Sequence, residues 1–202
     1  RAEVVDEDCD LQPVRIGEDA GEQGRLARAQ EPGQDRDGNG RAQGIPDTLR
    51  RLGVLLGRAE TAEASARRFE AQWHALAARY KDKPPVRVFW QLWHEPLMTI
   101  NREHLISEAM RACGGANVFA DLPLLTPSVS WEAAVAADPE LIATSGRKQD
   151  AARDFVSWRR FANVSAVKQQ RFVSIDGNLI GRMGPRFVEG AEALCAAIEA
   201  AR

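Results

Sequence analysis

The sequence predicts an α/β protein, and two observations carry this prediction. Short runs rich in β-branched and aromatic residues, such as Val86–Gln91 and Arg171–Ile175, alternate with segments of helical periodicity as far as the C-terminus. Such alternation is typical of a parallel sheet covered by helices on both faces. A long apolar stripe of helical spacing precedes these elements, between Ile45 and Tyr80. We therefore expect a three-layer α/β lobe with a parallel sheet, preceded by a long helix.

The composition is that of an ordinary globular protein. The 202 residues are 44% hydrophobic and 28% charged, with a formal net charge of −2. Because this charge comes without a polybasic cluster, nucleic acid is not expected as a partner. No apolar run approaches the roughly 18 residues that a membrane span requires. The first residues do not read as a signal peptide, which fits a mature form, a misplaced start or a cytosolic protein.

Residues 1–44 differ in composition from the rest of the chain. They contain no Phe, Trp, Tyr, Lys or Met, and their eleven acidic and six basic residues give a net charge of about −5. So little apolar surface cannot offset the entropy that is lost when a chain becomes ordered. We therefore predict that this segment is disordered.

The apolar stripe that follows predicts either one long helix or two helices that meet near Gly53 and Gly57. Pro46 is tolerated in a first helical turn, and the residues from Lys81 to Pro85 end the helix. We interpret the aromatic members of the stripe as core residues. The stripe consists of Leu49, Leu52, Leu56, Ala59, Ala62, Ala66, Phe69, Trp73, Leu76 and Tyr80.

The elements expected after Pro85 alternate in type. Cys113-Gly114-Gly115 is a typical helix stop, and Ser130 is a typical N-cap with Glu132 in the first turn behind it. The predicted strands are Val86–Gln91, Asn117–Phe119, Leu141–Thr144 and Arg171–Ile175; the predicted helices begin at Asn101 or Glu103, at Trp131, near Asp150, and at Phe187, the last running to Ala200.

Two loops that follow predicted strands carry the candidate binding residues. In an open α/β sheet, ligands bind in the crevice beyond the carboxyl ends of the strands. The first loop, 93–99, follows Val86–Gln91, and the second, 176–186, follows Arg171–Ile175. Their Trp, His, Met, Thr, Asn and Arg side chains suit a large, flat, partly polar ligand.

Enzymatic and metal-binding readings find little support. The sequence has no nucleophile elbow, phosphate loop or dinucleotide fingerprint, and its three histidines include no pair spaced for a metal. An acid–base pair of His94 and Glu95 with Asp176 would make the protein a small α/β enzyme, although nothing in the sequence brings them together. The cysteines form no CxxC pair, so buried free thiols and a Cys113–Cys195 bridge both stay open.

From about Ile45 to the C-terminus the chain resembles the periplasmic cobalamin-binding component of vitamin B12 ABC importers. This component belongs to the class of substrate-binding proteins with a helical backbone that bind metal chelates. The resemblance rests on Tyr80–Phe89, Cys113–Phe119, Val129–Glu132, Arg182–Arg186 and Leu194-Cys195, which occur in the family's order and spacing.

The resemblance implies a non-enzymatic periplasmic protein, monomeric when complete, that holds cobalamin between two lobes and delivers it to a membrane permease. Residues 45–81 would form the helix between the lobes, and residues 82–202 the C-terminal lobe. Glu132 would dock on the permease, and Cys113 and Cys195 would form the family's disulfide. No cofactor or metal is implied beyond the ligand. The residues implied or expected to bind the ligand are Trp93, His94, Pro96, Leu97, Met98, Thr99, Thr126, Asn178 and Arg182.

The chain departs from the family pattern before Ile45, where the first lobe is not recognisable. We expect residues 1–44 to be either disordered or an out-of-frame translation caused by a frameshift or a misplaced start. Because pockets in this fold differ in few residues, haem or a ferric siderophore is the alternative ligand.

Overall fold

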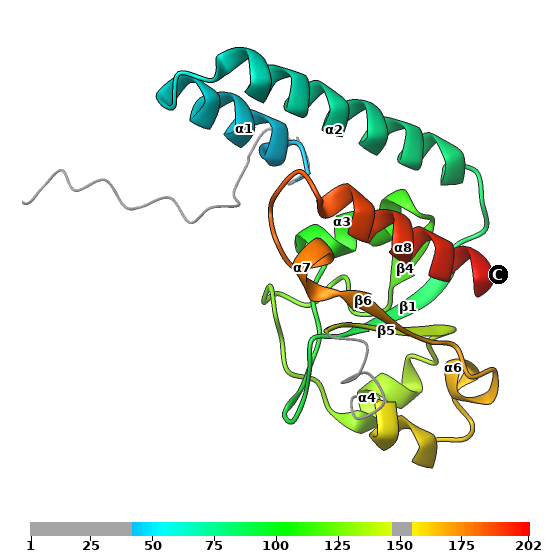
Figure 1. Ribbon diagram of the computed structural model, residues 1–202. Helices are drawn as coiled ribbons and strands as arrows, with labels where there is room; N and C mark the ends of the chain where they lie inside the picture. The colour runs from blue at the N-terminus through cyan, green and yellow to red at the C-terminus, as the bar shows by residue number, and fades with distance from the viewer. Residues whose placement is uncertain (1–41, 147–154) are drawn as a thin grey trace, which may run out of the picture. The chain divides into compact units, whose positions relative to one another are not determined.

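The computed structural model describes residues 42–146 and 155–202 (Figure 1). The expectations for residues 1–41, and most of the predicted helix that begins near Asp150, fall outside these ranges. No helix in the described ranges combines the length and the apolar character needed to cross a membrane.

The centre of the described chain is a parallel sheet in the order β4-β1-β5-β6, which confirms the predicted fold class. The strands are β1 (Val86–Gln91), β4 (Gly115–Asn117), β5 (Leu141–Gly146) and β6 (Phe172–Asp176). β4 begins and ends two residues before its predicted position. The reason is local, because the side-chain oxygen of Asn117 accepts a hydrogen bond from the Phe119 N–H at 2.9 Å and turns the chain out of the sheet.

Helices cover both faces of this sheet and complete the three layers (Figure 1). On one face an apolar cluster includes Val88 and Trp90 of β1, and on the other a second cluster, rich in aromatic residues, includes Phe89. The first face carries α3 (Leu105–Ala112), α7 (Gly177–Ile180) and α8 (Phe187–Ala200), and the second carries α4 (Trp131–Ala136), the 3-10 helix η2 (Ser157–Arg160) and α6 (Ser165–Lys168).

Two helices precede the sheet, α1 (Gly44–Leu55) and α2 (Ala59–Tyr80), and they lie side by side as an antiparallel hairpin (Figure 1). The single helix over residues 45–81 is therefore wrong, and the two-helix alternative is confirmed. Gly57 allows the reversal because its φ of +64° is a conformation that favours glycine. Gly53 lets the helices approach, since a Cβ there would lie 2.2 Å from the Cβ of Ala62.

The helical hairpin joins the first cluster through both helices, and Ile45 of α1 is buried there. Phe69, Leu76 and Tyr80 are buried in that cluster, and the ring centroid of Trp73 lies 6.0 Å from that of Phe187. The interpretation of these aromatic residues as core is therefore confirmed. A disulfide between Cys113, at the end of α3, and Cys195, on α8, ties the same face together with a Cα–Cα distance of 4.8 Å.

The helix caps follow the sequence in one case and differ in another. The Ser130 hydroxyl accepts a hydrogen bond from the Ala133 N–H at 3.1 Å, which confirms the predicted cap of α4. α3 begins at Leu105, after Asn101 and Glu103, because Nδ1 of His104 accepts a hydrogen bond from the Ile106 N–H at 3.1 Å. Asn101 is instead buried and fixes a neighbouring loop through the carbonyl of Leu122.

Candidate functional site

The candidate site is built at the edge of the sheet where the strands end. Because the strands of the sheet are parallel, the carboxyl ends of β1, β5 and β6 lie at the same edge. A two-stranded hairpin, β2 (Trp93–His94) and β3 (Leu97–Met98), follows β1 at this edge, and α7 follows β6 (Figure 1). The structure thus places the two predicted binding loops at the same edge of the sheet, after β1 and β6, with β5 between these strands.

The hairpin presents an aromatic side chain to the surface. Trp93 pairs with Met98 across the hairpin, and its side chain is 55% exposed although tryptophan is ordinarily well buried. Its indole N–H donates to the Glu95 carbonyl at 2.9 Å, and its ring centroid lies 5.2 Å from that of His94. With its only donor satisfied, the Trp93 ring is free to offer an apolar face to a flat molecule.

A third segment, residues 125–129, runs beside the hairpin and brings Thr126 to the same edge. The Thr99 N–H donates to the Pro127 carbonyl and the Val129 N–H to the Leu97 carbonyl, each at 2.9 Å. Thr126 itself is half-buried. The sequence resemblance implies a pocket role for Thr126, and this role stays a prediction.

Leu97 and Thr99 require a correction. Both were expected to contact a ligand, but their side chains are only 4% and 0% exposed. Side chains two residues apart in an extended segment point to the same side, so Leu97 and Thr99 face inward while Met98 between them stays half-buried. The exposed or half-buried members of the first loop are therefore Trp93, His94, Glu95, Pro96 and Met98.

The end of β6 contributes a polar and a cationic group. The Asp176 carboxylate accepts a hydrogen bond from the Asn178 N–H at 2.8 Å and caps α7. Asn178 and Arg182 are both exposed, and the Arg182 guanidinium forms no ion pair within the described ranges. A free guanidinium at this edge suits the polar periphery of a bound molecule.

A buried polar network, which was not predicted from the sequence, supports the start of the β2–β3 hairpin. The Trp158 indole N–H donates to the side-chain oxygen of Gln91 at 2.7 Å, and the Thr144 hydroxyl donates to the Gln91 carbonyl at 2.9 Å. Gln91 is the last residue of β1, so these bonds fix the point at which the hairpin leaves the sheet. The feature of the sequence that could have predicted this network is a polar residue, glutamine, at the end of an apolar strand.

The enzymatic alternative finds no assembled catalytic group. The Asp176 carboxylate is engaged as a helix cap, and no hydrogen bond or ion pair joins it to His94 or Glu95 in the described ranges. The described residues also contain no group of three or more His, Cys, Asp or Glu that could hold a metal.

Glu132 lies in the first turn of α4, three residues after Val129. Hydrogen bonds from its own backbone N–H and from the Ser130 hydroxyl lower the pKa of the Glu132 carboxyl, and the positive charge of Arg160 adds to this effect. Arg160 in turn lies over the rings of Trp131 and Phe161, at 4.8 and 4.7 Å from their centroids. The result is an exposed, ionised carboxylate beside an aromatic and cationic surface.

Comparison with known proteins agrees with this architecture. A family model described as "Periplasmic binding protein" matches residues 29–179. The chain belongs to this family. The match includes the β2–β3 hairpin, Thr126, Glu132 and Asn178. It begins before residue 45, so the similarity to the family extends into the segment 1–44, whose composition differs from the rest of the chain.

The curated relatives of this periplasmic binding protein include vitamin B12-binding proteins. The protein of that name from Vibrio cholerae serotype O1 is 29% identical over 159 residues, which are 78% of this chain and 56% of the relative. The Salmonella typhimurium protein is 29% identical over 154 residues, 76% of this chain and 56% of its own length. The chain thus spans little more than half the length of these relatives.

Solved structures share the fold. The periplasmic vitamin B12-binding protein of Vibrio cholerae superimposes with a TM-score of 0.71 at 27% identity, covering 79% of this periplasmic binding protein and 62% of the other chain. A haem-binding protein from Roseiflexus superimposes with a TM-score of 0.70 at 21% identity, covering 80% and 64%, which is a likeness of fold alone.

Proposed function

We propose that this chain is part of the substrate-binding component of an ABC importer and binds cobalamin or a related corrinoid in the periplasm. The observation that carries the proposal is that an exposed Trp93 follows β1 and that Arg182, which forms no ion pair with a described residue, follows β6 and α7 at the same edge of the sheet. The curated relatives, which are vitamin B12-binding proteins, support the same ligand class. Binding and delivery need no catalytic group.

The chemistry of the edge suits a corrinoid. Trp93, Pro96 and Met98 offer apolar surface on which a flat macrocycle can rest. Asn178 and Arg182 offer donors to amide or phosphate oxygens around it. In this proposal Leu97 and Thr99 do not touch the ligand. Their buried side chains hold the β2–β3 hairpin in place.

Calorimetric titration of the full chain with cyanocobalamin tests the proposal. We expect Trp93→Ala and Arg182→Gln each to weaken binding by about tenfold or more, since aromatic and arginine contacts dominate binding energies. The matched control is Arg186→Gln, an arginine in the same loop that already pairs with Glu189 at 3.4 Å. Absence of cyanocobalamin binding, or equal losses in all three variants, would contradict the proposal.

Haem is the second candidate, and His94 is the observation that favours it. Its imidazole is half-buried beside the exposed Trp93 ring, and imidazole is a common axial ligand of haem iron. Titration with haemin, followed by the shift of its main absorption band, separates the two ligands. If haem is the ligand, wild type will bind haemin more tightly than cyanocobalamin and His94→Ala will lose the shift.

Glu132 is the proposed contact with the membrane permease. Its carboxylate is charged at neutral pH, and its exposure leaves it free to meet a basic pocket. Glu132→Gln is expected to weaken binding to the importer in lipid discs without changing ligand affinity. Glu95→Gln, another exposed carboxylate, serves as the control.

A further inference from the structure

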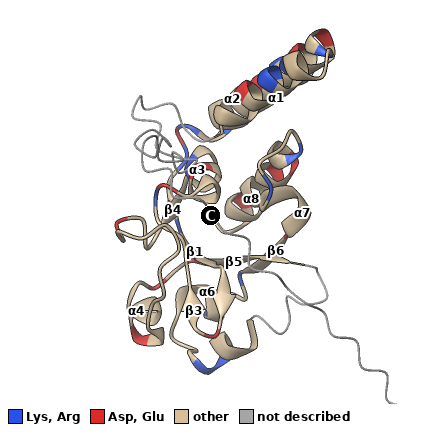
Figure 2. Cartoon of the chain, turned by 90° about the vertical axis from the view of Figure 1, so that its left-hand side faces the viewer, with Lys and Arg blue, Asp and Glu red and all other residues tan. Residues whose placement is uncertain are grey.

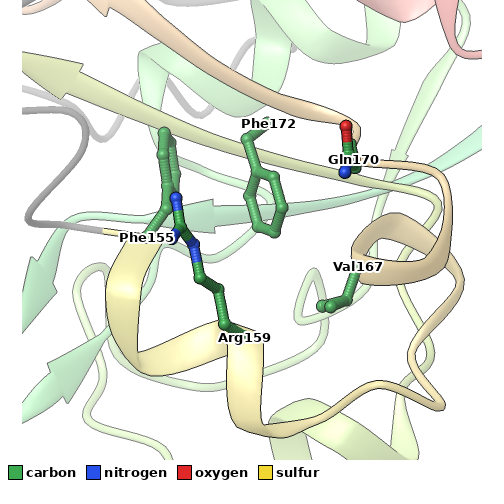
Figure 3. Close-up of a pocket in the computed structure, with 5 residues that line it drawn as sticks. All are labelled: Phe155, Arg159, Val167, Gln170 and Phe172. Carbon is green, nitrogen blue, oxygen red and sulfur yellow. The ribbon is translucent and has the colours of Figure 1, made fainter.

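A pocket of about 580 Å³ lies at the opposite end of β6 from the candidate site (Figure 3). Its lining residues in the described chain are Phe155, Arg159, Val167, Gln170 and Phe172. Phe172 opens β6, whereas Asn178 follows its end, so the two sites are separated by roughly 13 Å along the strand at about 3.3 Å per residue. No residue is shared between the pocket and the corrinoid site.

The pocket combines an apolar wall with polar groups at its rim. The Phe155 and Phe172 ring centroids lie 5.0 Å apart with planes tilted by 38°, and Phe155 is 9% exposed. Figure 3 shows Phe155 and Arg159 on one side and Val167 and Gln170 on the other, with the Phe172 ring between them. Such a wall accepts a flat apolar body of the size that ligand pockets usually hold.

Arg159 and Gln170 are the polar groups that this wall does not explain. Both are exposed, and neither side chain forms a hydrogen bond or ion pair with another described residue. The neighbouring Arg160 lies over the Trp131 and Phe161 rings, so of the two adjacent arginines Arg159 is the one that lines the pocket. A guanidinium and an amide beside an aromatic wall are the groups that recognise a carboxylate.

Gln170 lies in the turn between α6 and β6. Its φ of +54° lies in the left-handed region, which glycine adopts at little cost and other residues rarely adopt. A glycine would therefore serve the turn before β6 better than glutamine does. Gln170 directly follows Gln169, the C-cap of α6, so its side chain is carried into the pocket by the turn that ends this helix.

We propose that this pocket is a second ligand site, for a small carboxylate with a flat aromatic body. The aromatic body lies against Phe155, Phe172 and Val167. The carboxylate pairs with Arg159 and accepts a hydrogen bond from the Gln170 amide. The site does not depend on the corrinoid assignment, because it is formed at the other end of the sheet.

Calorimetric titration of the full chain with 2-naphthoate tests the site, with the neutral 2-naphthalenemethanol as the matched probe. We expect 2-naphthoate to bind more tightly than the alcohol, and Arg159→Gln to weaken 2-naphthoate by about tenfold while leaving the alcohol unchanged. Arg111→Gln, an exposed arginine on α3, is the control and should change neither.

The Gln170→Gly variant shows whether the Gln170 side chain contributes to ligand binding or to folding. The variant is expected to unfold at the same or a higher temperature than wild type, because glycine accepts the positive φ, and to bind 2-naphthoate several-fold more weakly. Saturating cyanocobalamin and the Arg182→Gln variant should leave 2-naphthoate affinity unchanged. The proposal is overturned if the alcohol binds as tightly as the carboxylate, if Arg159→Gln and Gln170→Gly bind like wild type, or if Arg182→Gln abolishes binding.

Discussion

The helical hairpin and the α/β lobe of this protein are held together in different ways. In the lobe, from β1 to α8, apolar clusters fill both faces of the sheet and a disulfide joins two helices of one face. In the hairpin, Arg50 of α1 pairs with Glu63 and Glu70 of α2, each at 2.8 Å, and charges of both signs follow the two helices (Figure 2).

The free end of the hairpin shows the same contrast. Val54, Leu55 and Leu56 are between 71% and 80% exposed there, whereas the large side chains of the lobe core are buried. Exposed ion pairs weaken when salt screens them or when their carboxylates are protonated, whereas apolar burial involves no charge that can be screened or titrated. The lobe is therefore expected to set the global stability, and the hairpin to respond to solution conditions.

Removing the disulfide is expected to have the largest effect. The bond closes a loop of sequence separation 82 between two buried cysteines. By the chain-entropy estimate, the double variant Cys113→Ala, Cys195→Ala loses about 4 kcal/mol of unfolding free energy. Urea denaturation measures this loss of unfolding free energy, and reduction of the disulfide in the wild type should cause the same loss. A change near zero would show that the lobe does not depend on this link.

Gly190→Ala is expected to come next, at about 3 kcal/mol, because an added Cβ overpacks a tight helix contact. A Cβ at Gly190 would lie 2.8 Å from the Ile180 nitrogen, and backbone cannot swing away as a side chain can. Gly44→Ala, in α1 of the helical hairpin, is the matched control, because no atom lies within 4 Å of a Cβ added there. Thermal unfolding should show a loss in the first variant and none in the second.

Gln91→Leu is expected to cost about 2 kcal/mol, because it leaves the buried Trp158 N–H without its acceptor. The same variant should weaken cyanocobalamin binding, since the hairpin that carries Trp93 leaves the sheet at this residue. Thr144→Val removes a single hydrogen bond to the Gln91 carbonyl and is the milder comparison. If Gln91→Leu binds cyanocobalamin with unchanged affinity, the hydrogen bonds of Gln91 do not support the binding site.

Breaking the Arg50 pairs is expected to have the smallest effect at neutral pH and a distinct pH dependence. Hydrogen bonds from Arg50 and Arg67 lower the pKa of Glu63 from 4.5 to about 2. A lowered carboxylate pKa stabilises the fold above the ordinary value of 4.5, and this stabilisation is lost as the pH falls toward 2. Glu70 shifts in the same direction, chiefly through its hydrogen bond with Arg50.

Melting temperatures of wild type and Arg50→Gln between pH 6 and pH 2, at low and high salt, measure this effect. The variant should lose less stability on acidification than the wild type does. Arg68→Gln, an exposed arginine of α2 outside these pairs, is the control. Identical acid profiles for wild type and Arg50→Gln would contradict the assignment.

Local signals explain why much of the fold could be predicted. The final helix, predicted over Phe187–Ala200, has those bounds in the structure, and β1 matches its predicted range. Ser130 caps its helix as expected, because a cap depends on residues within one turn. The disulfide was open on the residues alone, and it was the family resemblance that favoured it.

Non-local contacts decided the rest. Leu97 and Thr99 are buried because residues 127–129 pair with their backbone, and spacing along one strand cannot show that. Gln91 meets Trp158 across 67 positions, and Phe155 meets Phe172 only once both pack on the same face of the sheet. The ligand contacts of Asn178 and Arg182 stay predictions.

The sequence by itself determined the parallel α/β class, the strand exits that carry the candidate residues, and the Ser130 cap of α4, because periodicity and capping act over a few residues. Only the tertiary structure decided that the apolar stripe from Ile45 to Tyr80 folds back on itself at Gly57, since helical periodicity continues through a reversal. It also decided which side chains of the strand-end loops remain at the surface, because burial depends on partners that are distant in sequence.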